Sequence, residues 1–305
     1  MIPFELTILG TSSALPTIKR YPTAHVLNVG ERFFLIDCGE GTQIQLRKYG
    51  VKFSRINHIF ISHLHGDHYF GLIGLISTYT LLGRKNDLHI YSHSELPEML
   101  KMQLEQLLGD LTFKIIWHPL NFKKSAVILD DEKVTVTSFP LKHRIACCGF
   151  LFTEKSGPKN IIKEKIAQYQ IPLREIPHIK NGADFIDREG NTIPNGELTL
   201  PEKLPRKYAF CTDTLYIPEL KETLNGVNLL YHEATYDKRF QEQASQTYHS
   251  TAEQAATLAL NSNAGQLLIG HFSARYKDTE ILIEEAKRVF PATTAAEEGM
   301  VIKIS

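Results

Sequence analysis

Four side chains of the kinds that bind metals lie within six residues of one another, directly after an apolar stretch. The run Ile59–Ile61 is typical of a strand, and the residues after it include His63, His65, Asp67 and His68. Burying such groups without partners would cost roughly a few kcal/mol each. Neutral imidazole and carboxylate groups suit zinc at neutral pH. A solvated polar loop is the alternative, but this spacing directly after a strand favours a metal site.

Similar residues follow apolar runs elsewhere in the chain. His143, Asp213 and His271 each come within a few residues of such a run, and Glu233 does the same. Because strand ends at one edge of a sheet often assemble a site, we expect these side chains to converge with the first group. Asp37 also follows an apolar run, either as an acceptor that orients a metal-bound histidine or as a turn or helix-capping aspartate.

The sequence offers more candidate ligands than one tetrahedral zinc ion needs. We therefore predict two zinc ions per subunit, each with three ligands of its own and one ligand in common. The three sets are His63, His65 and His143; Asp67, His68 and His271; and Asp213 as the bridge. Two ions about 3.5–4 Å apart stabilise both the attacking and the leaving oxygen of a displacement. This chemistry is hydrolysis, and phosphodiesters are the best-suited substrates.

The elements that must position these residues follow from periodicity. Strand-like runs precede each candidate ligand, including the runs 208–212, 227–231 and 266–270. A capping box at Ser250–Glu253 predicts a helix that runs to about Leu260, directly after His249. Further helices are predicted at 42–49, 69–82, 95–108 and 280–290.

Length and composition are those of an ordinary globular protein with a sizeable core. The chain has 305 residues, of which 43% are hydrophobic and 22% charged. Its formal net charge is zero, so nucleic-acid binding would need a local basic patch. The four cysteines form no Cys-x-x-Cys pair, which argues against a disulfide framework or a thiolate zinc site. Without a leader-like N-terminus or an apolar run of about 20 residues, we expect no membrane span and a cytoplasmic location.

The segment from Glu154 to Pro205 differs from the rest of the chain in composition and in the pattern of its apolar residues. Prolines and glycines cluster and strand alternation is lost, although residues 160–169 predict one amphipathic helix. Between Lys155 and Lys180, six basic residues stand against two acidic ones. This segment could hold phosphates, or it could be an ordinary solvated helix face. We expect one domain over residues 1–305, with residues 154–205 as an inserted flexible arm.

These residues resemble the metallo-β-lactamase superfamily, whose signature is His-x-His-x-Asp-His, and within it the ribonuclease Z family of tRNA 3′-processing endonucleases. The similarity covers nearly the whole chain. Besides the metal residues it includes segments at 10–14, 37–40, 232–235, 248–251 and 271–276. The metal motif is common to the superfamily, whereas His232–Thr235 and Tyr248–Thr251 together are more specific to ribonuclease Z.

The resemblance implies an α/β fold, namely an αββα sandwich of two mixed sheets packed face to face with helices outside. It implies that metal-activated water cuts precursor tRNA 3′ of the discriminator nucleotide, leaving a 3′ hydroxyl on the tRNA and a 5′ phosphate on the trailer. Asp67 would hold a metal and accept the proton of the attacking water. His249 would protonate the leaving oxygen, and Glu233 would orient that imidazole and raise its pKa.

The resemblance also implies that the arm grips the tRNA elbow and that a homodimer places each arm at the other subunit's site. Basic arm residues become candidate phosphate contacts, namely Lys159, Lys163, Lys165 and Arg174. Ser273 and Arg275 are further candidates, with a purely structural loop as the alternative. Near the arm's tip, Ile171–Glu175 stands where many members carry a Gly-Pro-rich stretch.

Two other function classes fit parts of the sequence. A hydrolase of small substrates on the same fold, such as a phosphodiesterase, arylsulfatase or thioesterase, would need no long arm. A non-catalytic RNA-binding subunit would have lost ligands, whereas all seven candidates are present. Manganese and iron are alternatives to zinc, because histidine and aspartate ligands accept all three.

Overall fold

The computed structural model describes residues 3–107, 111–201 and 204–305, which divide into two compact units. The larger unit combines Met1–Thr153 with Arg206–Ser305, and the smaller unit is Glu154–Pro205. The predicted helix at 95–108 is observed as α4, Leu96–Leu107, and Leu108 lies outside the described residues. Of the predicted arm, residues 202–203 also lie outside them. None of the described helices is both long and apolar enough to cross a membrane.

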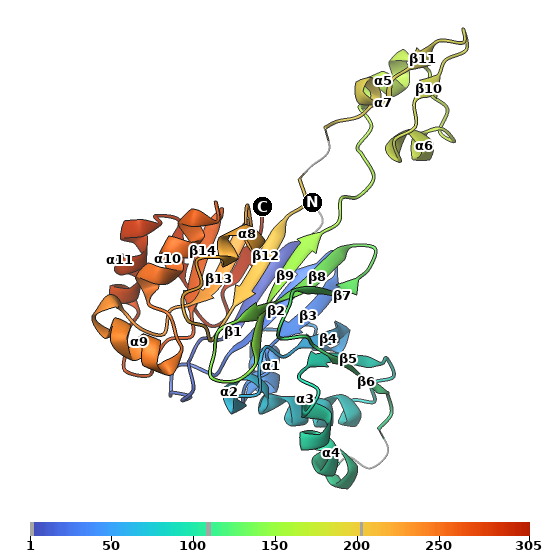
Figure 1. The fold of residues 1–305 in the computed structure, drawn as a ribbon. Coiled ribbons are helices and arrows are strands. Elements are labelled where there is room, and N and C mark those ends of the chain that lie inside the picture. The colour runs from blue at the N-terminus through green and yellow to red at the C-terminus, as the bar shows by residue number, and fades with distance from the viewer. Residues whose placement is uncertain (1–2, 108–110, 202–203) are drawn as a thin grey trace. The chain divides into compact units, whose positions relative to one another are not determined.

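The first sheet of the larger unit has seven strands, four of them parallel to their neighbours and the rest antiparallel (Figure 1). Their order across the sheet is β16 (Val301–Lys303), β1 (Phe4–Gly10), β2 (Ala24–Val29), β3 (Arg32–Ile36), β4 (Ile56–Phe60), β5 (Leu88–Ser92) and β6 (Ile115–Pro119). The parallel part is β3 to β6, so the carboxyl ends of β3 and β4 lie side by side.

The second sheet also has seven strands and is likewise mixed. Their order is β15 (Thr293–Ala295), β14 (Gln266–Gly270), β13 (Leu229–Glu233), β12 (Lys207–Cys211), β9 (Cys147–Glu154), β8 (Val134–Leu141) and β7 (Ala126–Asp130). Strands β12 to β15 are parallel, whereas β9 runs antiparallel to β12. The carboxyl ends of β12, β13 and β14 therefore share one edge.

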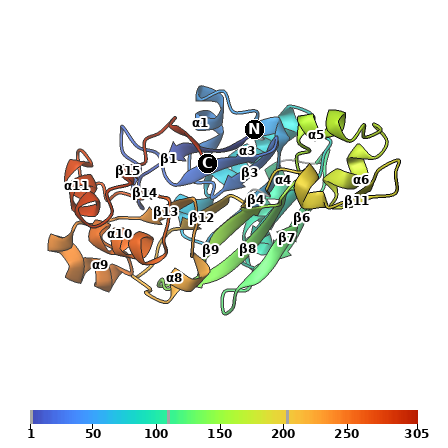
Figure 2. The same ribbon diagram turned by 90° about the horizontal axis from the view of Figure 1, so that it is seen from above.

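Helices cover the outer faces of both sheets, so the predicted αββα sandwich is confirmed. Those that follow strands of the first sheet are α1 (Thr42–Lys48), α2 (Gly66–Tyr69), α3 (Gly71–Leu81) and α4. Those of the second half are α8 (Leu220–Thr223), α9 (Gln241–Thr247), α10 (Ala252–Asn261) and α11 (Glu280–Val289). Figure 2 shows α1 and α3 on one side of the sheet pair and α8 and α10 on the other.

Apolar side chains fill three layers between these elements, because successive strand residues point to opposite faces of a sheet. Phe60 of β4 belongs to the cluster between the sheets, together with Phe150 and Phe210 of the second sheet. Its neighbour Ile59 belongs instead to the cluster that includes Leu72 of α3. Beneath α10 and α11 lies a third cluster. Two covered sheets with apolar faces give a rigid frame for the loops at the strand ends.

The smaller unit has its own small core and only short elements. The elements are α5 (Lys163–Gln168), α6 (Ile176–Lys180), β10 (Phe185–Ile186), β11 (Thr192–Ile193) and α7 (Asn195–Leu198). The core is formed by Ile171, Ile179, Phe185, Ile193 and Leu198. The helix predicted at 160–169 is wrong at its start. Ile161 forms an antiparallel bridge with Thr199, and the Ile162 amide donates to the Leu198 carbonyl, so the chain stays extended until α5.

Candidate metal centre and active site

The candidate ligands lie where strands of the two sheets end. His63 follows β4, His143 follows β8, Asp213 follows β12, and His271 comes directly after β14. Glu233 does not follow its strand as predicted, because β13 stays paired with β14 as far as Glu233 and Gly270. The polar residues therefore reach one region from both sheets.

Strained backbone accumulates in the same turns. Eight described non-glycine residues have a left-handed backbone, and five of them surround the candidate site: Ala14, Asp37, Asp213, Tyr248 and His271. Such conformations cost about 1–3 kcal/mol each and persist where the surroundings impose them. Asp37, Asp213 and His271 take this conformation within two residues of a strand end, and Tyr248 takes it at the end of α9, Gln241–Thr247.

The first group of ligand atoms contains three imidazole nitrogens. His65 Nδ1 lies 3.1 Å from His63 Nε2 and 3.1 Å from His143 Nε2. Burial lowers the pKa of all three histidines, which favours the neutral form that ligates metals. Asp213 Oδ2 completes the group, at 3.6 Å from the Nε2 atoms of His63 and His143.

The second group contains Asp67, His68 and His271. His68 Nε2 lies 3.3 Å from Asp67 Oδ2, and His271 Nε2 lies 3.6 Å from the same oxygen. Both Nε2 atoms are buried, and among the described residues neither makes a well-aligned hydrogen bond, although carboxylate oxygens lie close to both. Buried polar nitrogens without partners are costly, so a cation at this place would satisfy both.

Asp213 links the two groups through its two oxygens. Its Oδ2 faces the first group, while Oδ1 lies 3.2 Å from His68 Nε2 and 3.1 Å from His271 Nε2. The Thr212 hydroxyl donates to Oδ1 at 2.8 Å and helps to fix the carboxylate. This orientation is the one a carboxylate needs to bridge two ions.

Each candidate ligand histidine except His65 has a partner for its other ring nitrogen. Asp37 Oδ2 lies 2.7 Å from His68 Nδ1, and Ser62 Oγ lies 3.0 Å from His63 Nδ1. The remaining partners are the Tyr248 carbonyl for His143 Nδ1 and the Thr235 hydroxyl for His271 Nδ1, both at 3.0 Å. Such partners fix the ring orientation and the nitrogen that faces the metal. Of the two interpretations of Asp37, the structure favours the histidine acceptor.

Negative charge dominates the centre. Burial lowers the pKa of His68, but the carboxylates of Asp67, Asp213 and Asp37 outweigh it and hold this pKa well above its usual value. Burial likewise raises the pKa of Asp67, while His68 and His271 reverse the effect and hold it well below the usual range. A site that draws a proton onto a buried imidazole in this way also suits a divalent cation.

A carboxylate–histidine pair stands beside the metal groups. His249 Nδ1 lies 2.9 Å from Glu233 Oε1. Burial opposes the charged imidazole, but Glu233 outweighs it and raises the pKa of His249 to about 9. Glu233 is fully buried and also accepts from the Thr214 amide and the Thr235 hydroxyl. His249 also belongs to a further group of possible ligands with Asp213 and His271.

The helix after His249 begins one residue later than predicted. Thr251 is the N-cap of α10, and the reciprocal partner is Gln254 rather than Glu253. Ser250 instead donates to the Thr214 carbonyl at 2.7 Å, which ties the His249 loop to the turn after Asp213. Tertiary contact thus removes Ser250 from the capping role that its sequence position suggests.

An open pocket of about 310 Å³ gives access to these side chains. Besides metal residues and His249, its lining includes Ala14, Gly66, Phe70 and Arg144, which the sequence did not single out. The Ala14 amide donates to Asp67 Oδ2 at 2.8 Å. Ala14 belongs to the family-like segment 10–14, which is the only sequence signal that pointed to any of these four.

The candidate substrate contacts lie outside this pocket lining. Arg275 packs over the Phe240 and Tyr236 rings, and its Nε lies 3.3 Å from Ser273 Oγ. The four basic candidates belong to the smaller unit. There Lys159 bonds to Asn195, Lys165 lies over the Tyr169 ring, Arg174 pairs with Glu175, and Lys163 is exposed.

Comparisons with known proteins show which chains this one is similar to. A curated ribonuclease Z of Bacteroides thetaiotaomicron is 52% identical over 305 residues, which is 100% of this chain and 96% of that protein. Residues 4–160 match the family model described as anti-Pycsar protein Apyc1. The crystal structure of human tRNase Z, short form, is 29% identical with a TM-score of 0.72, and covers 99% of both chains.

A further solved structure shares the fold alone. The metallo-beta-lactamase fold protein YhfI from Bacillus subtilis is 19% identical with a TM-score of 0.69, covering 99% of this chain and 100% of that one. The αββα architecture is therefore that of the metallo-β-lactamase fold.

Proposed function

This chain belongs to the ribonuclease Z family, and we propose that it cuts precursor tRNA with two zinc ions. Through residues 4–160 it also belongs to the family described as anti-Pycsar protein Apyc1. It is a metal-using hydrolase, an endoribonuclease of tRNA 3′-end processing. The proposed cut lies 3′ of the discriminator nucleotide. The products are a tRNA with a 3′ hydroxyl and a trailer with a 5′ phosphate.

One observation carries the two-metal proposal, namely that the oxygens of Asp213 face two different ligand groups. His63, His65 and His143 would hold one ion, and Asp67, His68 and His271 the other. When bound, two zinc ions supply activated water and offset the charge that develops on the phosphoryl oxygens. The unpartnered Nε2 atoms of His68 and His271 support the second ion.

Asp67 serves the attacking side of the reaction. Its Oδ2 faces the Nε2 atoms of His68 and His271 and also accepts from the Ala14 amide. Because its pKa is held low, the carboxylate is charged whenever the site is assembled. It can hold the proton of the attacking water only transiently, and the proton then passes to solvent.

His249 serves the leaving side. Its Nδ1 is engaged by Glu233, which leaves Nε2 to donate a proton to the ribose 3′ oxygen. Glu233 raises the pKa of His249 against the effect of burial, which favours the protonated imidazole that a proton donor needs. Glu233 is held by donors from Thr214 and Thr235, so it can orient the ring without moving.

The smaller unit is proposed to bind the tRNA elbow as an arm. Its charges are segregated, with six basic and two acidic residues between Lys155 and Lys180. That segment offers Lys159, Lys163, Lys165 and Arg174 to phosphates. Family resemblance supports a cytoplasmic homodimer in which each arm serves the other subunit. Light scattering tests the dimer, and mixing an Asp213→Ala subunit with an arm-charge variant tests the exchange of arms.

The decisive experiment uses the purified protein and a 3′-extended precursor tRNA, with and without chelator, and maps both product ends. We expect a single cut after the discriminator that the chelator abolishes. Elemental analysis should find two zinc ions per chain in the wild type and fewer in Asp213→Ala. A variant that kept two ions would refute the bridging role of Asp213.

A hydrolase of small phosphodiesters on the same fold is the alternative function. A small substrate would need no arm, and the family model that matches residues 4–160 leaves out most of it. The ribonuclease Z relatives, in contrast, align with the full chain, including the arm. Hydrolysis of bis(p-nitrophenyl) phosphate beside precursor tRNA separates the two. Activity on the small ester alone would favour the alternative.

A further inference from the structure

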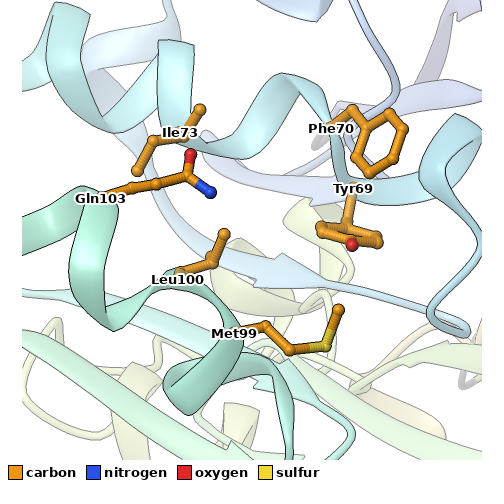
Figure 3. A pocket seen from close by; sticks show the side chains of 6 residues that line it. All are labelled: Tyr69, Phe70, Ile73, Met99, Leu100 and Gln103. Carbon is orange, nitrogen blue, oxygen red and sulfur yellow. The ribbon is translucent and has the colours of Figure 1, made fainter.

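A second, smaller pocket adjoins the active-site pocket and shares one wall with it. Its volume is about 90 Å³, and Figure 3 shows its lining: Tyr69, Phe70, Ile73, Met99, Leu100 and Gln103. These residues come from the end of α2, from α3 and from α4. Phe70 also lines the active-site pocket. Phe70 is therefore the residue that the two pocket linings have in common.

Phe70 is held firmly although 61% of it is exposed. A Cβ atom on Gly66 would collide with Phe70 Cε2, so the ring rests directly on the backbone of the metal motif. The Tyr69 ring meets it edge-on, with centroids 5.0 Å apart and an interplanar angle of 70°. A flat apolar face is thereby fixed close to the candidate ligand Asp67.

The surroundings of this ring suit a nucleobase. The smaller pocket is lined by apolar groups together with the hydroxyl-bearing Tyr69 and Gln103, whose polar groups can both donate and accept hydrogen bonds. Proteins commonly bind unpaired bases by stacking them on fixed aromatic side chains. The 3′ trailer is single-stranded where it leaves the tRNA, so its first base is free to stack.

We infer that Phe70 stacks on the base of the first trailer nucleotide and that the smaller pocket receives the edge of that base. This inference rests on the proposed function. His249 and Phe70 line the same pocket but share no ring neighbour, because His249 contacts His143, His271 and Tyr236 and Phe70 contacts Tyr69. If His249 protonates the discriminator's 3′ oxygen, the other ester oxygen of the phosphate leads to the trailer. The pocket wall formed by Gly66 and Phe70 then lies on the side of the phosphate that carries the trailer.

The test combines variants at Phe70 with precursor tRNAs that lack one base. Phe70→Ala should lower kcat/KM on the ordinary precursor by about 5- to 150-fold, the range expected when one stack is removed. Phe70→Leu keeps an apolar side chain over Gly66 but lacks the flat face, so it should lose nearly as much. Phe70→Trp should retain activity. Leu81→Ala is the matched control, because Leu81 is an exposed α3 residue that lines neither pocket.

The abasic substrates decide which base is bound. When the first trailer nucleotide is abasic, the penalties of Phe70→Ala and Phe70→Leu should disappear, because there is no stack left to lose. Penalties that persist would show a structural role and overturn the inference. Penalties removed only by an abasic discriminator would assign the ring to the other base and overturn it too. Phe70→Leu at the wild-type rate would refute stacking, whereas a wild-type protein that cuts no precursor would refute the proposed function itself.

Discussion

The metal centre and the smaller unit have different proposed tasks, and they differ in how tightly their side chains are held in place. At the metal centre, Asp37, Ser62, Thr235 and the Tyr248 carbonyl each hold one histidine ring at hydrogen-bonding distance. In the smaller unit the elements are short, the core is small and the basic side chains lie largely at the surface. Hydrolysis needs atoms placed to within a fraction of an ångström. Holding a phosphate backbone needs charge density, which acts over about 8–10 Å.

The largest effect should come from His249→Ala, which removes the proton donor while leaving the metal ligands intact. We expect kcat on precursor tRNA to fall by about 10²- to 10⁴-fold with binding retained. Bis(p-nitrophenyl) phosphate should lose much less, because p-nitrophenolate leaves without a proton. Equal losses on both substrates would mean that His249 acts on the metal centre instead. His178→Ala in the smaller unit is the control.

Asp37→Ala tests whether the side chains that orient the ligand histidines matter as much as the ligands themselves. Asp37 is fully buried and accepts from Ser62 as well as facing His68 Nδ1. Loss of such a partner costs about 10- to 100-fold in metal affinity. Titration against a competing chelator measures this metal affinity. The control is Asp131→Ala, because Asp131 lies in a turn and pairs with Arg32. Unchanged zinc affinity would contradict the orienting role.

Glu233→Gln should move the alkaline limb of the pH profile rather than abolish activity. The carboxylate raises the pKa of His249, whereas burial lowers it. Activity that needs the imidazolium is lost as pH rises through this pKa, so removing the charge should shift the limb to lower pH. The kcat/KM profile on precursor tRNA measures the shift. A limb that stays in place would show that another group sets it.

The smallest change is expected in the smaller unit. Reversing charge in Lys163→Glu with Arg174→Glu should raise KM for precursor tRNA and leave kcat unchanged. The slope of log affinity against log salt should flatten by about one for each phosphate that the variant no longer neutralises. Arg188→Glu, in the acidic half of the same unit, is the matched control. Because Arg188→Glu changes the net charge by two and the double variant by four, a change in log affinity half as large from Arg188→Glu would reject a specific basic surface and leave only net charge.

These two regions also differed in how far the sequence described them. Metal residues after strands were recognisable because ligand chemistry restricts the residue types and because strand ends converge at a sheet edge. Helix limits in the smaller unit were wrong, since Asn160–Ile162 pairs with Leu198–Leu200 instead of continuing α5. The capping residue of α10 was missed for the same reason, as Ser250 bonds across the fold to Thr214.

By itself the sequence indicated the candidate ligand set through residue types and spacing, and its resemblance to a known family implied the αββα architecture and the family. Only the tertiary structure decided which oxygen of Asp213 faces which group, that Thr235 joins Glu233 to His271, and that Phe70 lines two pockets. Each of these depends on distances between residues far apart in the chain or on the direction of one side chain. Local patterns carry no information about such distances until the two sheets pack together.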